Sequence, residues 1–311
     1  MTKQKCQTEP RRPKALIVPP RKEHTHTIIL LHEKGDKGRE FGRGFLKATG
    51  LQDHFPNVRF VFPCAFNAPL PTLASGDKTQ VGAQKRITAP AQWFDDRPHV
   101  RSCTSATASL PETGRFMQRL VHEEAKVIAQ TGRCGMHGAH RRIIIGGKGQ
   151  GGAAALLYLL GSHRQLGGLL CFDTVLSWEY QLQLALEVTG SGGGDSHVGA
   201  LRGVNLMRGL LGFEGLDESR DLSGSKDGLH HLRTPVFFGC GGESRCSGRP
   251  IVSLLGCGFQ MDVTERWCEN RGEQRYAHPD NVEAVLGFLA GMYMTRVCTV
   301  TNSEVVVEKD E

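Results

Sequence analysis

The feature that most constrains the fold is a glycine-rich segment, Gly147–Gly152, between two apolar segments of different character. The β-branched run Arg142–Ile145 before it is typical of a short buried strand. The segment after it, from Gly151 to Leu157, opens a helix. A strand that passes into a helix over so few residues needs a tight turn, and Gly149 lies at the centre of this one. The sequence therefore predicts a strand–turn–helix unit, a building block of α/β domains.

Apolar β-rich runs and segments of helical periodicity alternate along the rest of the chain. Strands are predicted at 15–18, 27–32, 58–63, 142–146, 168–172, 235–239 and 261–264. Helices are predicted at 41–49, 113–130, 152–160, 179–187 and 281–294. This alternation predicts an α/β fold with a mostly parallel twisted sheet and helices on both faces. Because ligands of such folds lie beyond the carboxyl ends of the strands, the Gly149 turn lies on the functional edge.

Length and charge limit the classes of protein to consider. A chain of 311 residues, 39 % of them hydrophobic, suits one large domain. We expect that domain at 24–296, between a basic, proline-containing N-terminal tail at 1–23 and a C-terminal tail at 297–311. The formal net charge of +6 is scattered and forms no basic stripe interleaved with aromatic residues. No nucleic-acid partner is therefore predicted.

No targeting segment is predicted from the residue pattern. Its N-terminus lacks the apolar h-region of a secretory signal, and no stretch of about 18 apolar residues predicts a transmembrane segment. We expect a cytoplasmic protein whose ten cysteines are free thiols. Cys134, His137 and His140 supply three soft ligands in one segment but no fourth, so a connecting loop is favoured over a metal site. No metal and no cofactor are predicted, and the oligomeric state is left open.

Several motifs occur in a consistent order between His24 and Leu289. They are a strand that runs into Leu31-His32-Glu33-Lys34-Gly35-Asp36, the strand at 55–63, Trp93-Phe94-Asp95, the glycine-rich turn, the strand at 234–239 and the helix at 276–289. In this order they resemble the phospholipase/carboxylesterase family of α/β-hydrolases, the group that contains the acyl-protein thioesterases. The resemblance implies the α/β-hydrolase fold, with a nucleophile elbow at Gly147–Gly152.

The residues at the family's catalytic positions differ from the family pattern. The resemblance implies a serine nucleophile, an aspartate and a histidine where this chain has Gly149, Ser244 and Gln274. Glu243 lies one residue from the acid position and is a candidate substitute, although a loop shifted by one residue would aim it elsewhere. His278 lies four residues from the base position. It is either a second substitute or a surface histidine beside a helix N-terminus.

The region that would hold the oxyanion is altered as well. The resemblance places the two backbone donors at Lys34 and Gln150, and main-chain N–H groups survive a change of side chain. Glu33, however, replaces the glycine after His32. A carboxylate there would oppose a developing oxyanion. Its alternative role is an ion pair with Lys148 across the vacated site.

Three functions are consistent with these residues. The first is a catalytically impaired serine-hydrolase homologue, a pseudoenzyme that keeps the fold and an acyl-binding groove, because nucleophile, acid and base all differ. The second is an active carboxylic ester or thioester hydrolase, of the palmitoyl-protein or lysophospholipid type, with a relocated nucleophile. Cys171 and Cys240 are its candidates, and buried structural thiols are the alternative. The third is a non-catalytic module that binds a fatty-acyl chain or an acylated protein.

A groove for an acyl chain would need apolar residues over the elbow. Leu156, Leu170, Phe172 and Trp93 are the candidates, with ordinary core packing as the alternative. The loop at 69–88 is either a lid or a flexible surface excursion. Ser191–Asp195 is predicted to be a flexible loop and Ser223–His231 a polar connector.

Overall fold

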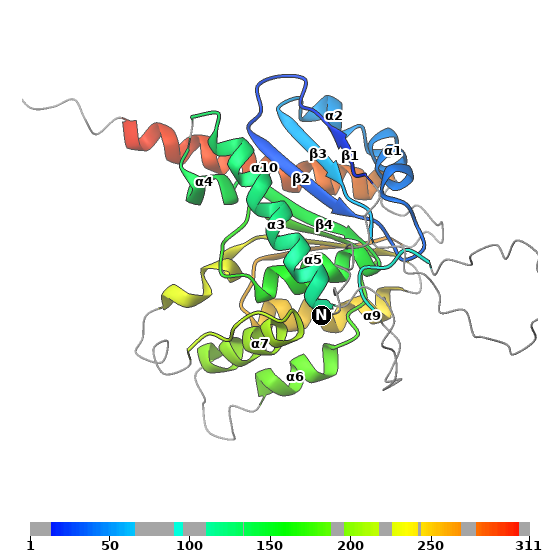
Figure 1. Cartoon of the computed structure of the whole chain (residues 1–311), viewed down its shortest axis with the longest axis vertical. Helices are drawn as coiled ribbons and strands as arrows, with labels where there is room; N and C mark the ends of the chain where they lie inside the picture. Colours follow the sequence, from blue (N-terminus) through cyan, green and yellow to red (C-terminus); the bar gives the residue numbers. More distant parts are fainter. Residues whose placement is uncertain are drawn as a thin grey trace, which may run out of the picture.

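The computed structural model describes residues 14–65, 90–95, 110–132, 134–187, 196–217, 226–241, 244–268 and 278–304. Within them the chain forms one seven-stranded sheet with helices on both faces (Figure 1). The strands are β1 (Leu16–Val18), β2 (His26–Leu31), β3 (Val58–Phe62), β4 (Ile143–Lys148), β5 (Gly168–Phe172), β6 (Val236–Gly241) and β7 (Val263–Cys268). Their spatial order is β1-β3-β2-β4-β5-β6-β7, so β4 lies in the middle of the sheet. Strand β1 is antiparallel to β3, and all other neighbours pair in parallel.

The helices form two layers, one on each face of the sheet. Helices α1 (Gly38–Thr49) and α10 (Pro279–Glu304) pack on one face. Helices α3 (Leu110–Ala129), α5 (Gln150–Gly161), α6 (Glu179–Glu187) and α7 (Ser196–Leu210) pack on the other. The shorter elements are α2 (Leu51–His54), α4 (Met136–His140), α9 (Ser244–Ser253), the 3₁₀-helix η1 (Lys226–Arg233) and the π-helical turn η2 (Leu254–Gly258).

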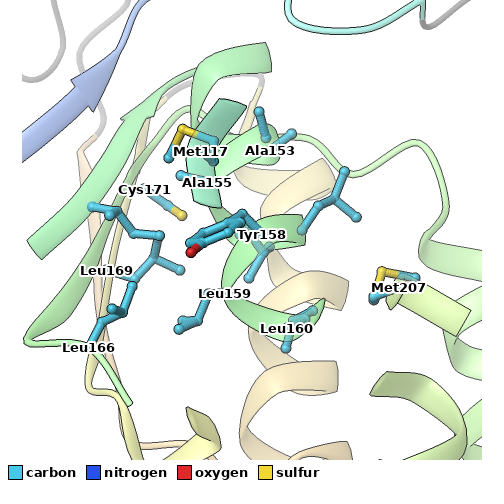
Figure 2. Packing of buried hydrophobic residues seen from close by; sticks show 14 of the residues in the cluster. Met117, Ala153, Ala155, Tyr158, Leu159, Leu160, Leu166, Leu169, Cys171 and Met207 are labelled. Carbon is cyan, nitrogen blue, oxygen red and sulfur yellow. The ribbon is translucent and has the colours of Figure 1, made fainter. Parts of the chain in front are cut away.

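The side chains of each strand divide between two hydrophobic cores because successive residues point to opposite faces. In β2, Ile28 and Leu30 belong to the cluster under α1 and α10, whereas Ile29 and Leu31 belong to the cluster under α5. All four are fully buried. Helix α5 is covered on every side, with all of its residues buried. Figure 2 shows how Tyr158 and Leu159 of this helix pack against Leu169 and Cys171 of β5.

Most predicted elements are confirmed, and β5 and α6 have the predicted bounds. Strand β7 was placed too early, because its pairing with β6 continues as far as Cys268. The segment Cys134–His140, predicted as a connecting loop, contains helix α4, and His140 Nδ1 lies 2.7 Å from the Met136 carbonyl oxygen. Within the described residues, no three His, Cys, Asp or Glu side chains are grouped as metal ligands would be.

Regular elements extend beyond the predicted domain bounds at both ends. Strand β1 lies inside the range predicted as a tail, and its pairing with β3 makes it part of the sheet. Helix α10 continues past residue 296 to Glu304. The polar connector predicted at 223–231 overlaps η1, which begins at Lys226. The loops predicted at 69–88 and 191–195 lie outside the described residues. Among the helices that the structure describes, none is both long and apolar enough to cross a membrane.

Candidate functional site

The turn at Gly149 joins the central strand β4 to the start of helix α5. Its backbone has φ 52° and ψ −121°, a conformation that residues with a side chain adopt only with strain. The Gly149 N–H donates a hydrogen bond of 2.9 Å to the Phe172 carbonyl oxygen at the end of the neighbouring strand β5. The predicted strand–turn–helix unit is therefore confirmed, and its backbone is held in the strained shape that a nucleophile elbow requires.

The first turn of α5 lies very close to the end of β2. A Cβ atom added at Gly151 would lie 2.4 Å from the Leu31 carbonyl oxygen and 2.5 Å from that of His32. Only a residue without a side chain fits at this distance, because backbone atoms cannot rotate away. This close approach brings the turn after β2 beside Gly149.

Glu33, the second residue after β2, fills the space in front of Gly149. A Cβ atom added at Gly149 would lie 2.0 Å from Glu33 Oε1 and 2.5 Å from Glu33 Cδ. The other carboxylate oxygen, Oε2, lies 3.1 Å from Lys148 Nζ. The predicted ion pair between Glu33 and Lys148 is therefore confirmed. The carboxylate occupies the place where the side chain of an elbow nucleophile would begin.

A tight turn holds Glu33 in this position. The Asp36 N–H donates a 3.0 Å hydrogen bond to the Glu33 carbonyl oxygen, and Gly35 has φ 88°, as the third residue of a type II turn requires. Lys34, one of the two predicted oxyanion donors, is an exposed residue of this turn. Gln150, the other, is the first residue of α5. Glu33, the first residue of this turn, thus lies beside the start of α5.

His32 is a buried part of the framework. The Ala65 N–H donates to His32 Nε2 at 3.0 Å, so Nε2 is the unprotonated nitrogen. The proton is then on Nδ1, which donates to the Glu33 carbonyl oxygen at 2.7 Å. Burial is the main cause that lowers the pKa of His32, which keeps the imidazole neutral. With both nitrogens used, His32 fixes the Glu33 backbone and has no atom left to act as a base.

The side chain of Gln150 ties α5 to the Trp93 segment. Its Oε1 accepts a 2.8 Å hydrogen bond from the Trp93 N–H, and its Nε2 donates a 3.0 Å bond to the Phe94 carbonyl oxygen. The Trp93 indole N–H in turn donates to the His32 carbonyl oxygen at 2.8 Å. Three segments that are distant in the sequence are thus locked around the elbow. These hydrogen bonds fix the backbone of the three segments relative to one another.

The predicted acid and base positions lie mostly outside the described side chains. Ser244 is the first residue of α9, while Glu243 and Gln274 lie outside the described residues. His278 stands just before α10, where its carbonyl oxygen accepts the Asn281 N–H at 2.9 Å. Its Nδ1 lies 3.6 Å from an oxygen of Asp280, in the first turn of the same helix. The structure therefore places His278 beside a helix N-terminus.

The two candidate cysteine nucleophiles are core residues. Cys171 and Cys240 are 0 % and 1 % exposed. Burial, with a smaller contribution from Cys240, raises the pKa of the Cys171 thiol to about 12. A thiol with such a pKa is protonated at neutral pH, whereas a nucleophilic cysteine must be a thiolate.

The four candidate groove residues lie in the core and belong to two different clusters. Leu156 and Trp93 are part of the cluster on the α5 side of the sheet. Leu170 and Phe172 belong to the cluster on the α1 side. All four are at most 2 % exposed. They therefore do not line one common surface, because the sheet lies between them.

Sequence reasoning gave Asp173 no role of its own. It follows β5 and has φ 48°, which is unusual for a residue with a side chain. Its Oδ1 accepts a 3.3 Å hydrogen bond from the Gly241 N–H at the end of β6. Asp173 thus joins the ends of two strands at the same edge as the elbow. An aspartate directly after a predicted strand was the only signal in the sequence.

Comparison with known proteins agrees with this geometry. Residues 12–190 match the family model described as phospholipase/carboxylesterase. The chain belongs to this family. The matched region contains the turn after β2, the Trp93 segment and the elbow, whereas Ser244, Gln274 and His278 lie beyond it.

Curated relatives match about half of the chain. Acyl-protein thioesterase 1 of Cryptococcus neoformans is 30 % identical over 166 residues, which cover 52 % of this chain and 59 % of that protein. Lysophospholipase-like protein 1 of Mus musculus is 25 % identical over 162 residues, with the same two coverages of 52 % and 59 %. The match thus spans less than two thirds of the length of these relatives.

Solved structures support the fold over a longer part of the chain. Acyl-protein thioesterase 2 of Zea mays aligns with a TM-score of 0.51 and 15 % identity, covering 90 % of this chain and 98 % of that chain. SOBER1 of Arabidopsis thaliana aligns with a TM-score of 0.51 and 14 % identity, covering 86 % and 99 %. At this level of identity the likeness establishes the α/β-hydrolase fold alone.

Proposed function

We propose that this chain is a non-hydrolytic member of the phospholipase/carboxylesterase family, which keeps the elbow and lacks the groups that would use it. The observation that carries the proposal is the Glu33 carboxylate in the space before Gly149. Acyl transfer needs an activated nucleophile, a base that takes its proton and an acid that orients the base. Gly149 has no reactive atom, and the family resemblance assigns Ser244 and Gln274 to the acid and base positions.

The charge of Glu33 opposes hydrolysis independently of the missing nucleophile. The transition state of acyl transfer develops a negative charge on the substrate oxygen beside the elbow. The ion pair with Lys148 and the surrounding solvent screen part of the Glu33 charge, but the carboxylate still disfavours a negative charge that develops beside it. The N-terminus of α5, which would favour an oxyanion, instead favours the resident carboxylate.

A relocated cysteine nucleophile fits the described residues less well. Burial raises the pKa of Cys171 to about 12, so its thiol stays protonated at neutral pH. Cys240 is equally buried. Neither sulfur is within reach of an ester without a rearrangement of the core.

The proposal is tested by assaying the full chain with p-nitrophenyl butyrate and a palmitoyl thioester. We expect no turnover above a heat-inactivated control. Hydrolysis that disappears in Cys171→Ala or Cys240→Ala would establish a relocated nucleophile and refute the proposal.

The reverse experiment rebuilds the missing groups. The combined change Glu33→Gly, Gly149→Ser, Ser244→Asp, Gln274→His should yield weak esterase activity and labelling by a fluorophosphonate. Glu33→Gly is included because its carboxylate fills the position of the new side chain. The matched control carries Ala instead of Ser at 149 and should stay unlabelled. Equal labelling of both variants would mean that the reactive group lies elsewhere.

We further propose an acylated protein, through its acyl chain, as the ligand class, because the relatives include proteins named acyl-protein thioesterases. Burial of each methylene contributes about 0.8 kcal/mol and needs no catalytic residue. A fluorescent palmitoyl analogue should therefore saturate the protein at micromolar concentrations. Linear, non-saturating uptake would mean that the apolar residues near the elbow form only a closed core, and it would refute this ligand class.

A further inference from the structure

A cavity of about 610 Å³ opens at the opposite end of α5 from the elbow. It lies between α3, α5 and the end of α7, which pack against one another on the same face of the sheet (Figure 1). Four arginines line it, namely Arg115, Arg119, Arg164 and Arg208, together with three histidines. Among the described residues that line it, Glu214 is the one carboxylate. The cavity is therefore strongly basic, unlike the mixed surface that the scattered charges of the sequence suggest.

One stripe of α3 supplies much of this charge. Gln118, Arg119 and His122 lie three, four and seven residues after Arg115, so all four share one face of the helix. All four line the cavity and are exposed. In the part of the chain that the structure describes, Arg115, Arg119 and Arg164 take part in no ion pair. Three guanidinium groups thus face the cavity with their charge uncompensated by a bonded carboxylate.

Arg208 has a different part in the lining. It is 9 % exposed, and its Nη1 donates a 2.8 Å hydrogen bond to the Gly161 carbonyl oxygen at the end of α5. Its Nε donates to the Glu214 carbonyl oxygen at 2.5 Å. Arg208 therefore caps the C-terminus of α5, and its two hydrogen bonds hold the guanidinium group in place beside the cavity.

The floor of the cavity is buried and carries hydroxyl groups. Tyr158 and Ser162 are each 5 % exposed, and His140 is 4 % exposed. Burial, followed by the charge of Arg164, lowers the pKa of His140 and of the rim residue His163. Burial also raises the pKa of Tyr158, so its hydroxyl keeps its proton. The floor thus presents neutral groups capable of hydrogen bonding below a cationic rim.

We propose that this cavity binds a small phosphorylated molecule. Guanidinium groups match phosphate oxygens with paired hydrogen bonds, and several of them around one recess favour an anion of more than one charge. The volume falls within the range of about 300–1,000 Å³ that holds small organic ligands, so it admits more than a single phosphate ion. The site lies away from Gly149, and it does not depend on the proposed loss of hydrolysis.

The test is calorimetric titration of the full chain with inorganic pyrophosphate and with ADP, using citrate as a carboxylate of similar charge. We expect saturable binding of both phosphates at one site, with a Kd below about 1 mM, and citrate binding at least about tenfold weaker. No saturation, or equal binding of citrate, would overturn the proposal. Binding to vesicles that contain phosphatidic acid, without binding of either soluble phosphate, would assign the site to a lipid headgroup and also overturn it.

A matched pair of variants locates the binding. Arg115→Gln with Arg119→Gln should raise the Kd for pyrophosphate at least about tenfold. Arg39→Gln with Arg43→Gln removes the same charge at the same spacing from exposed positions of α1 and should change it less than about twofold. Because all four arginines are exposed, both variants should keep the thermal stability of the parent chain. An equal loss of affinity in the two variants would indicate a general charge effect and refute a site in this cavity.

Discussion

Helix α5 begins beside a carboxylate, Glu33, and ends beside a guanidinium group, Arg208. At its N-terminus the backbone is strained at Gly149, and a carboxylate from another segment fills the space that the turn leaves open. At its C-terminus, the Gly161 carbonyl oxygen accepts Arg208 Nη1, and Leu160 accepts His231 Nε2 at 3.1 Å. Both arrangements follow the helix dipole, which favours anions at the first turn and cations at the last. The comparison indicates that the helix framework persists at both ends, whereas the side chains placed there decide which ligand each end accepts.

The two ends should differ most in their tolerance of a single methyl group. At Gly151 a Cβ atom would meet two backbone oxygens, whereas at Gly161 it would meet the end of the Leu211 side chain at 2.5 Å, which can rotate. We expect Gly151→Ala to lower the free energy of unfolding by more than about 3 kcal/mol, and Gly161→Ala by less than about 1 kcal/mol. Urea unfolding of both variants measures the difference. Equal losses of unfolding free energy would mean that the two ends of α5 are packed equally closely.

Protonation of His231, at the C-terminal end of α5, should account for much of the loss of unfolding free energy in acid. His231 is fully buried, and burial, opposed by its bond to Leu160 and reinforced by Arg208, lowers its pKa from 6.5 to about 4. Between about pH 6.5 and 4, His231 therefore binds a proton in the unfolded chain but stays neutral in the folded chain. The contribution of neutral His231 to the unfolding free energy is fully present above about pH 6.5. It is lost as the pH falls towards about 4, and the total loss is on the order of 3 kcal/mol.

His231→Gln isolates this effect, because an amide can donate to Leu160 without titrating. The unfolding free energy of this variant should fall less steeply than that of the parent chain between pH 6.5 and 4. Parallel pH profiles for the two proteins would contradict the assignment to His231. His32, whose pKa is also lowered by burial, should leave a residual slope in both.

A side chain introduced at residue 149 tests the backbone strain at the N-terminal end of α5. Gly149→Ser must adopt φ near 52°, at a cost of about 1–3 kcal/mol, and must displace the Glu33 carboxylate. We expect a lower melting temperature and no recovery of esterase activity. Adding Glu33→Gly removes the obstruction but not the backbone strain, so most of the loss should remain. An unchanged melting temperature of Gly149→Ser would mean that the turn is not strained in solution.

The smallest effect should come from the ion pair that closes the elbow. Lys148 and Glu33 are 18 % and 39 % exposed, so solvent screens their attraction. Lys148→Met should change the unfolding free energy by less than about 1 kcal/mol. A loss well above that value, measured at low and high salt, would show that the pair holds the turn after β2 in place.

Much of the fold could be predicted because its signals are local. The β-branched run before Gly149 and the period-two division of residues such as Ile28 and Ile29 are properties of the chain itself. Helix α7 was not predicted, because its three glycines lower the intrinsic helix propensity even though Leu201, Val204 and Met207 recur at a helical spacing. It is stabilised by packing of Val204 and Met207 into the core beside α5. Helix α4 is too short for a periodic signal, so only contacts with α3 could reveal it.

The sequence by itself determined the order of the seven described strands, the family and the absence of a serine at residue 149. It also placed Glu33 and Lys148 near the vacated site, because a family pattern links those positions. Only the tertiary structure decided that Glu33 points into the space before Gly149 and that Leu156 and Leu170 lie on opposite sides of the sheet. It alone gathered Arg115, Arg164 and Arg208 around one cavity. The physical reason is that backbone preferences act over a few residues, whereas a site is made by side chains that packing brings together from distant segments.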